Sequence, residues 1–132
     1  MKKKLLMSPE EAVELIKDGD VVATGGFIGT GLPEIISSAL EEKYKKSGFP
    51  KDLTLVFAAG QGSKNGDGND HFAHKGLIKR VIGGHWAKCP KMGEMANNNE
   101  IEAYNFPQGI MAQLLRTAAA GQPGLLSHVG LN

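Results

Sequence analysis

A glycine-rich segment near the start of the chain carries the residues best suited to chemistry. The run DGDVVATGGFIGTGLPE covers residues 18–34 and holds five glycines beside Phe27. The apolar residues before the cluster predict a short buried strand, and Pro33 with Glu34 predicts a helix start directly after it. Glycines in a strand-to-helix loop leave backbone N–H groups open, so they could stabilise an oxyanion in acyl transfer. Spacing alone equally allows a tight turn with no ligand.

Nucleotide binding by the common glycine motifs is excluded. The dinucleotide motif G-x-G-x-x-G would begin at Gly29 and would need a third glycine where Glu34 stands. The phosphate-binding motif G-x-x-x-x-G-K-[ST] does not occur anywhere in the sequence. We therefore expect no nucleotide phosphate to be cradled by either route.

Metal binding is the other chemistry that the residue types suggest. His71 and His74 have a spacing that places two imidazoles on one helix face, and His85 and Cys89 follow. The spacing between the two pairs fits no standard zinc pattern, so we expect satisfied or surface histidines and no metal. The run GSKNGDGND, residues 62–70, resembles calcium loops in composition but lacks the glutamate at the twelfth position. We expect it to be a flexible active-site loop or a disordered surface loop.

Composition places the chain among soluble globular proteins. Its 132 residues are 41% hydrophobic and 22% charged, with 15 Lys+Arg against 14 Asp+Glu, which argues against nucleic-acid binding. The basic start MKKKLL leads into no apolar signal-peptide region, and no apolar run could span a bilayer, so we expect no membrane association. A single cysteine, Cys89, indicates a reducing, cytoplasmic setting.

The elements that would position the glycine segment alternate between strand and helix. This alternation predicts an α/β fold with an open, mostly parallel sheet and helices on both faces, a Rossmann-like architecture within a single domain over residues 1–132. Ser8, Pro9 and Glu11 predict the first helix start through a capping box, and Gly48 predicts the end of the second helix. The expected helices cover residues 9–17, 33–47, 71–76, 90–99 and 108–120, and the expected strands cover 21–24, 53–58, 77–84, 101–105 and 124–131.

The segment from Asp18 to Pro33 resembles the N-terminal signature of the family I coenzyme A transferases. That signature reads [DN]-[GN]-x-x, three apolar residues, then G-G-F-x-x-x-G-x-P, and Thr24 is the only departure from it. A second block, residues 71–131, is similar to short-chain acyl-CoA transferases of the propionate and acetoacetate type through its YNFPQG and AAAGQPG segments. The resemblance covers essentially the whole chain and only the opening portion of the family's protein.

The resemblance implies a mechanism whose nucleophile lies elsewhere. Family members move CoA between an acyl-CoA and a free carboxylate through a glutamate that becomes a CoA thioester, and this glutamate belongs to the β half. No glutamate here lies in a comparable motif, so we assign no catalytic residue in this chain. The glutamates are instead expected on helix surfaces: Glu10, Glu11, Glu14, Glu34, Glu41, Glu42, Glu94, Glu100 and Glu102.

The same resemblance implies where substrate would bind. Four residues would line the acyl and thioester site with backbone N–H groups near the reacting carbonyl: Gly25, Gly26, Phe27 and Gly31. Gln108 and Gly109, in the FPQG segment, would contact substrate. Capping of the helix that follows Pro107 is the alternative role for this turn.

Partners and cofactors also follow from the resemblance. We expect an incomplete N-terminal fragment of the α half, whose partner is the missing C-terminal or β half of the transferase, in a homo-oligomer. The substrates would be a CoA thioester and a small carboxylate such as acetate, propionate or acetoacetate, with no permanently bound cofactor. The alternatives are a non-catalytic module that binds acyl-CoA or a carboxylate, and a fragment that oligomerises through exposed apolar surface.

Overall fold

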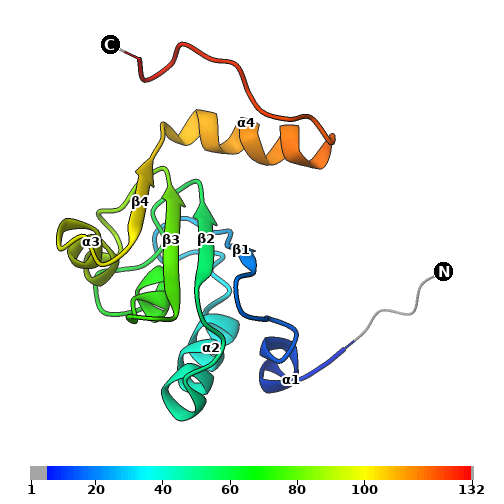
Figure 1. The fold of residues 1–132 in the computed structure, drawn as a ribbon, viewed down its shortest axis with the longest axis vertical. Helices are drawn as coiled ribbons and strands as arrows, with labels where there is room; N and C mark the ends of the chain where they lie inside the picture. Colours follow the sequence, from blue (N-terminus) through cyan, green and yellow to red (C-terminus); the bar gives the residue numbers. More distant parts are fainter. Residues whose placement is uncertain (1–5, 132) are drawn as a thin grey trace.

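The computed structural model describes residues 6–131 and arranges them as a sheet with helices (Figure 1). Residues 1–5 and 132 lie outside the described part. The elements in chain order are helix α1 Pro9–Val13, strand β1 Val21–Ala23, helix α2 Glu34–Ser47, strand β2 Leu53–Phe57, 3-10 helix η1 Gly68–Phe72, strand β3 Ile78–Gly83, helix α3 Pro90–Asn97, strand β4 Glu102–Asn105 and helix α4 Gln108–Ala119.

The four strands form one parallel sheet in the order β1-β2-β3-β4. The predicted open parallel sheet of an α/β protein is therefore confirmed. The arrows of β2, β3 and β4 point towards α4, which crosses beyond their tips (Figure 1), and β1 runs parallel to β2. Because the strands are parallel, the loops that follow them gather at a single edge of the sheet, the edge where ligands bind in open α/β proteins.

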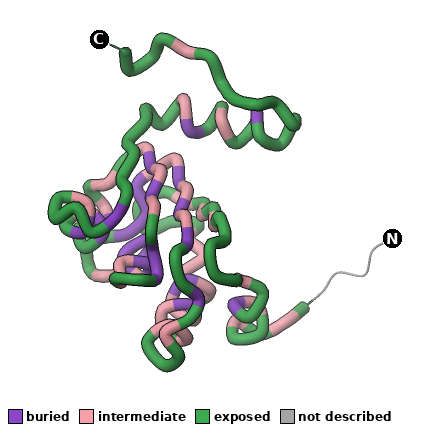
Figure 2. The backbone as a smooth tube through the Cα atoms, viewed as in Figure 1, coloured by how far each residue is buried: buried purple, intermediate pink, exposed green. Residues whose placement is uncertain are grey.

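One face of the sheet carries the hydrophobic core. Val22, Leu55 and Val81 are partners in adjacent strands, so their side chains lie in one row on this face. Leu40 of α2, together with apolar residues of η1 and α3, belongs to the same buried cluster. Figure 2 shows the buried segments along the strands and the inner sides of these helices. The members of the cluster are Val13, Leu40, Leu53, Leu55, Phe57, Phe72, Leu77, Ile78, Val81, Cys89, Met92, Met95 and Ile101.

The opposite face is much less covered. The register places Ala23, Val56, Ile82 and Tyr104 in one row across the four strands of this face. Ala23 is exposed, Val56 and Ile82 are half-buried, and Tyr104 is 46% exposed. The sequence predicts helices on both faces, whereas the helices of residues 6–131 that share the core pack on one face. The second face therefore keeps an apolar row open, which we call the open row.

Local signals set several element ends as predicted. The capping box forms, because the Glu11 N–H donates to Ser8 Oγ at 3.2 Å and the Ser8 N–H donates to Glu11 Oε2 at 2.9 Å. Gly48 ends α2 with φ of 72°, a left-handed conformation that favours glycine, and its N–H donates to the Tyr44 carbonyl at 2.7 Å. The first helix ends at Val13 and not at residue 17, because the amides of Leu15 and Ile16 bond three positions back.

Two predicted elements differ in the structure. The short helix predicted for 71–76 is a 3-10 turn three residues earlier, Gly68–Phe72. The strand predicted for 124–131 is wrong, because those residues form no ladder with any strand of the described chain. Leu126 of this tail is fully exposed, so it lacks the burial that its apolar pattern suggested. Among residues 6–131, no helix combines the length and apolarity needed to cross a bilayer.

Core packing makes a first prediction. Leu55 has no exposed surface, and its replacement in L55A should lower the free energy of unfolding by about 2–5 kcal/mol because it leaves a cavity at the centre of the core. The matched control is L126A in the tail, where Leu126 is fully exposed and the change should stay within about 0.5 kcal/mol. Urea unfolding followed by circular dichroism measures both. Equal losses in the two variants would contradict the assignment of the core.

Candidate functional site

The candidate site is the loop of residues 24–31 that follows β1, here called the glycine loop. Its tip is a small turn in which Phe27 and Thr30 exchange two backbone hydrogen bonds, each 2.9 Å long. Ile28 makes two hydrogen bonds to the loop that follows β2. Its N–H donates to the Gly60 carbonyl at 2.7 Å, and its carbonyl accepts from the Gly62 N–H at 2.8 Å. The backbone of the tip is thus held by main-chain bonds on both sides.

The amides at the base of the glycine loop are not used by the protein. Within the described chain, the N–H groups of Gly25 and Gly26 have no acceptor at hydrogen-bonding distance, whereas those of Phe27 and Ile28 do. A Cβ built on Gly25 would meet nothing within 4 Å, so open space lies beside this amide. Gly26 has φ of 125° and Gly31 has φ of 68°, both in the region that favours glycine. The base of the loop therefore holds two adjacent N–H groups that make no hydrogen bond within the described chain, with open space beside Gly25.

Phe27 stands at the tip of the loop and is 60% exposed. A side chain of this size on the surface leaves a large apolar area in water. It therefore offers an apolar wall beside the free donors. Gly31 lies at the far end of the loop, where its backbone approaches Gly26.

A second loop, residues 58–67, is hydrogen-bonded to the glycine loop. Gln61 is buried, and its Nε2 donates to the Thr24 carbonyl at 2.9 Å. The Thr24 hydroxyl in turn donates to Oδ1 of buried Asn69 at 3.2 Å. The interpretation of residues 62–70 as a flexible or disordered loop is therefore wrong for its second half, where Gly68, Asn69 and Asp70 are buried.

Gln61 and Asn69 are site residues that sequence reasoning missed. Each keeps one buried polar atom, Oε1 of Gln61 and Nδ2 of Asn69, without a partner in the described chain. The sequence signal that could have found these two residues is the pair of glycines beside them, Gly62 and Gly68. In the structure both glycines have positive φ, and a Cβ on either would clash with backbone atoms. Such contacts indicate tight packing and not mobility.

Gln108 and Gly109 lie at the start of α4, at the same edge of the sheet. Gln108 is exposed, and its Cγ would be 3.0 Å from a Cβ on Gly84, which directly follows β3. The end of β3 is two strand spacings from β1, or about 10 Å. No side chain caps this helix start, so the capping alternative for the turn is not realised. The structure thus places Gln108 next to the turn after β3, at the same edge of the sheet as the glycine loop.

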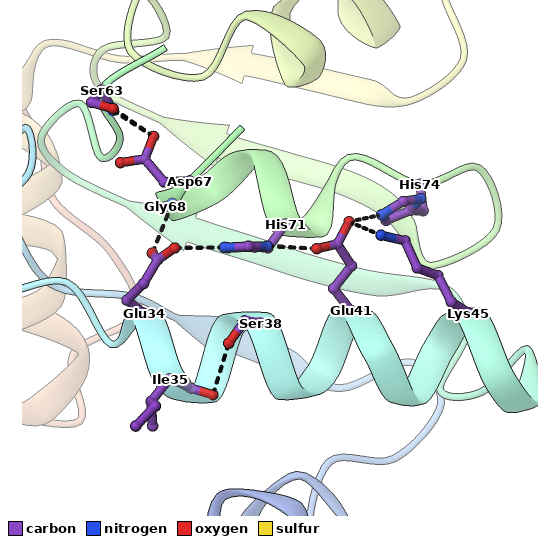
Figure 3. Close-up of polar contacts among 10 residues, drawn as sticks. All are labelled: Glu34, Ile35, Ser38, Glu41, Lys45, Ser63, Asp67, Gly68, His71 and His74. Carbon is purple, nitrogen blue, oxygen red and sulfur yellow. Dashed lines mark hydrogen bonds and ion pairs between the residues drawn. The ribbon is translucent and has the colours of Figure 1, made fainter. Parts of the chain in front are cut away.

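His71 and His74 belong to a network of ion pairs that joins α2 to η1 (Figure 3). His71 lies between two carboxylates, with Nε2 2.6 Å from Glu34 Oε1 and Nδ1 2.6 Å from Glu41 Oε2. His74 and Lys45 both contact Glu41 Oε1 at 2.7 Å. The expectation that Glu41 is a surface residue is wrong, since its side chain is 13% exposed.

The electrostatics of this network follow from burial and pairing. Burial alone would raise the pKa of the Glu41 carboxyl, but hydrogen bonds from Lys45, His71 and His74 outweigh it and lower the pKa to about 2. Burial alone would lower the pKa of His71, but the bonds to Glu41 and Glu34 raise it above its usual 6.5. Pairing in the network therefore favours the protonated form of His71 and the ionised form of Glu41.

Cys89 and His85 do not extend this network into a metal site. Burial, with the nearby Asp70 charge, raises the pKa of the Cys89 thiol to about 12, so it stays protonated and is a poor metal ligand. His85 is exposed in the loop after β3. Across residues 6–131, no group of three or more His, Cys, Asp or Glu side chains could hold a metal ion.

The glycine loop yields a prediction on stability. In G26A the new methyl would lie 2.6 Å from Leu32 Cδ2 at a φ of 125°, so we expect a loss of roughly 1–3 kcal/mol in the free energy of unfolding. The matched variant G25A meets nothing within 4 Å and should unfold like the wild type. Thermal unfolding compares the two. An unfolding midpoint for G25A as low as that of G26A would contradict the described loop.

Comparisons with known proteins extend these observations. The family model described as Coenzyme A transferase matches residues 6–132. The acetate CoA-transferase YdiF of Escherichia coli K12 is 38% identical over 128 residues, which are 96% of this chain and 24% of that protein. The acetate CoA-transferase subunit alpha of the same strain is 31% identical over 129 residues, 98% of this chain and 56% of that subunit.

A solved structure agrees with the sequence matches. The acyl-CoA transferase YdiF of E. coli O157:H7, in a thioester complex with CoA, has a TM-score of 0.93 at 36% identity. The match covers 96% of this chain and 26% of that one. The chain thus spans about a quarter of YdiF and about half of the alpha subunit. The resemblance predicted from the Asp18–Pro33 motif is confirmed, and the chain belongs to the coenzyme A transferase family.

Proposed function

We propose that this chain is the N-terminal part of the first half of a CoA transferase that moves CoA between a short-chain acyl-CoA and a free carboxylate. Acetate, propionate and acetoacetate are the carboxylates we propose. The glutamate that carries CoA as a thioester lies outside this chain, so the chain itself supplies no nucleophile. The observation that carries the proposal is the pair of free amides at Gly25 and Gly26, within the segment that matches the family motif.

The free amides suit the reaction because acyl transfer builds negative charge on a carbonyl oxygen. Attack on a thioester converts that oxygen into an oxyanion, and two fixed N–H donors stabilise it most when they already point at its position. The main-chain bonds of Ile28 and the buried Gln61 hold the loop, so little reorganisation accompanies the reaction. Phe27 would face the acyl group, and Gln108 with Gly109 would contact the substrate farther along the sheet edge.

The remaining part of the transferase is the proposed partner. The relatives are named as transferases and transferase subunits, and the chain spans only part of each. The open row of the sheet supports this proposal, because an apolar face of this kind normally packs against further structure. We further propose a homo-oligomer in the cytoplasm, with the CoA thioester as a substrate and no permanently bound cofactor. A free-standing binding module is not favoured, since the named relatives are enzymes.

The missing nucleophile predicts that this chain alone is inactive. The purified 132-residue chain should transfer no CoA from acetyl-CoA to propionate above the rate of the buffer. Liquid chromatography of propionyl-CoA over several hours measures the transfer. Adding the remainder of the transferase as a separate polypeptide should restore it. Turnover by the chain alone would contradict the proposal.

The role of the free amides is tested by a methyl group placed beside them. In the complete transferase, G25A should lower kcat by roughly 100-fold, because the methyl occupies the space proposed for the thioester oxygen. The matched control is G29A, since a Cβ there also meets nothing within 4 Å and Gly29 also lacks a positive φ. It should retain kcat within about twofold. Equal activity of G25A and G29A would refute the proposed oxyanion role.

A further inference from the structure

We propose that His71 is a positioning residue whose imidazolium form holds the glycine loop in place for acyl transfer. The proposal deepens the proposed function and rests on it only for the effect on catalysis. The positioning itself concerns the described residues alone, so it can be measured without any activity.

The geometry requires a doubly protonated ring. Both nitrogens of His71 lie 2.6 Å from carboxylate oxygens, and ionised carboxylates only accept hydrogen bonds. A neutral imidazole has one N–H, so one nitrogen would then present a lone pair to a carboxylate. The side chains of His71 and Glu41 are each only 13% exposed, which limits the screening of that repulsion by water. Both bonds are therefore satisfied only in the charged form.

The network reaches both ends of the glycine loop. Glu34 is the first residue of α2 and comes three residues after Gly31, so its position fixes the end of the loop. Its Oε1 contacts His71, and its Oε2 accepts from the Gly68 N–H at 2.9 Å. Asn69, the next residue of η1, accepts from Thr24 at the start of the loop. His71 thus joins α2 to η1 (Figure 3). Through Asn69 and Gly68, η1 holds the glycine loop at its beginning and its end.

The other titratable groups near His71 also have partners of their own. Lys45 and His74 both contact Glu41 on the side away from Glu34. The remaining acidic groups of this region have other partners. Asp67 accepts from Ser63 at 2.7 Å, and Asp70 accepts from the amides of Lys91 at 3.0 Å and Met92 at 3.3 Å. The titratable groups that face the ring are therefore Glu34 and Glu41 from α2, and Lys45 and His74 contact Glu41.

The sign of the pH dependence follows from the two shifts. The pKa of His71 is raised in the folded chain, so the stabilisation is full below 6.5 and is lost as the pH rises through the higher folded value. The pKa of Glu41 is lowered to about 2, so its contribution is full above 4.5 and is lost as the pH falls towards 2. The network is strongest between these limits, and its alkaline limit belongs to His71.

The test is an NMR titration of the 132-residue chain with amide exchange as the second readout. We expect His71 to titrate above 6.5, and the exchange protection of the Phe27 and Ile28 amides to fall about tenfold or more at the same pH. E41Q should lower the pKa of His71 and move the loop transition with it. K46Q is the control, because Lys46 pairs with exposed Glu42 of the same helix and lies outside the network, and it should leave the loop at neutral pH unchanged. Exchange protection of the Phe27 and Ile28 amides that stays constant while His71 titrates would overturn the proposal.

A pH profile of kcat/KM in the complete transferase separates this inference from the proposed function. In the complete transferase, kcat/KM should fall at alkaline pH with the pKa of His71, and E41Q should shift that limb to lower pH while kcat at the optimum changes less. Absence of CoA transfer in the wild type would refute the proposed function and leave the loop measurements to support positioning. If E41Q still transfers CoA and its kcat/KM falls at the same alkaline pH as in the wild type, the positioning role alone is refuted.

Discussion

The main-chain ladder of the parallel sheet is the constraint on which the site depends. Four strands that run the same way bring the glycine loop, the Gln61 loop, the turn after β3 and the start of α4 to one edge, although they lie far apart in sequence. The ladder fixes the strands laterally at about 5 Å intervals, so each loop has a set place along that edge. The buried row on one face holds the ladder itself in place, because it removes apolar surface from water.

Much of this arrangement could be predicted from local sequence signals. Ser8 with Glu11 predicted the capping box, Gly48 predicted the end of α2, and apolar runs predicted the first three strands, because each signal acts through neighbours a few residues away. The motif from Asp18 to Pro33 predicted both the family and the position of the glycine loop. The roles of its residues, and those of Gln108 and Gly109, stay predictions.

The features that the sequence did not reveal depend on contacts between distant segments. Glu41 looks like any polar residue of an amphipathic helix until His71 and His74, some thirty positions later, meet it. Gln61 and Asn69 lie in a polar run that resembles a mobile loop, yet both are buried and hydrogen-bonded to Thr24. The tail at 124–131 has the apolar pattern of a strand but finds no ladder to join, and pattern alone does not provide a neighbour.

The strand order also determines where a larger domain could grow. Parallel crossovers are almost always right-handed, so strands added one after another in a single direction send all their connecting helices to the same face. The order β1-β2-β3-β4 is such a progression, so the face that carries the open row receives no connecting helix. Helices reach that bare face only if new strands are added in the opposite direction, outward from β1. The reversal point would then fall beside the glycine loop, where diverging connections leave a crevice between them.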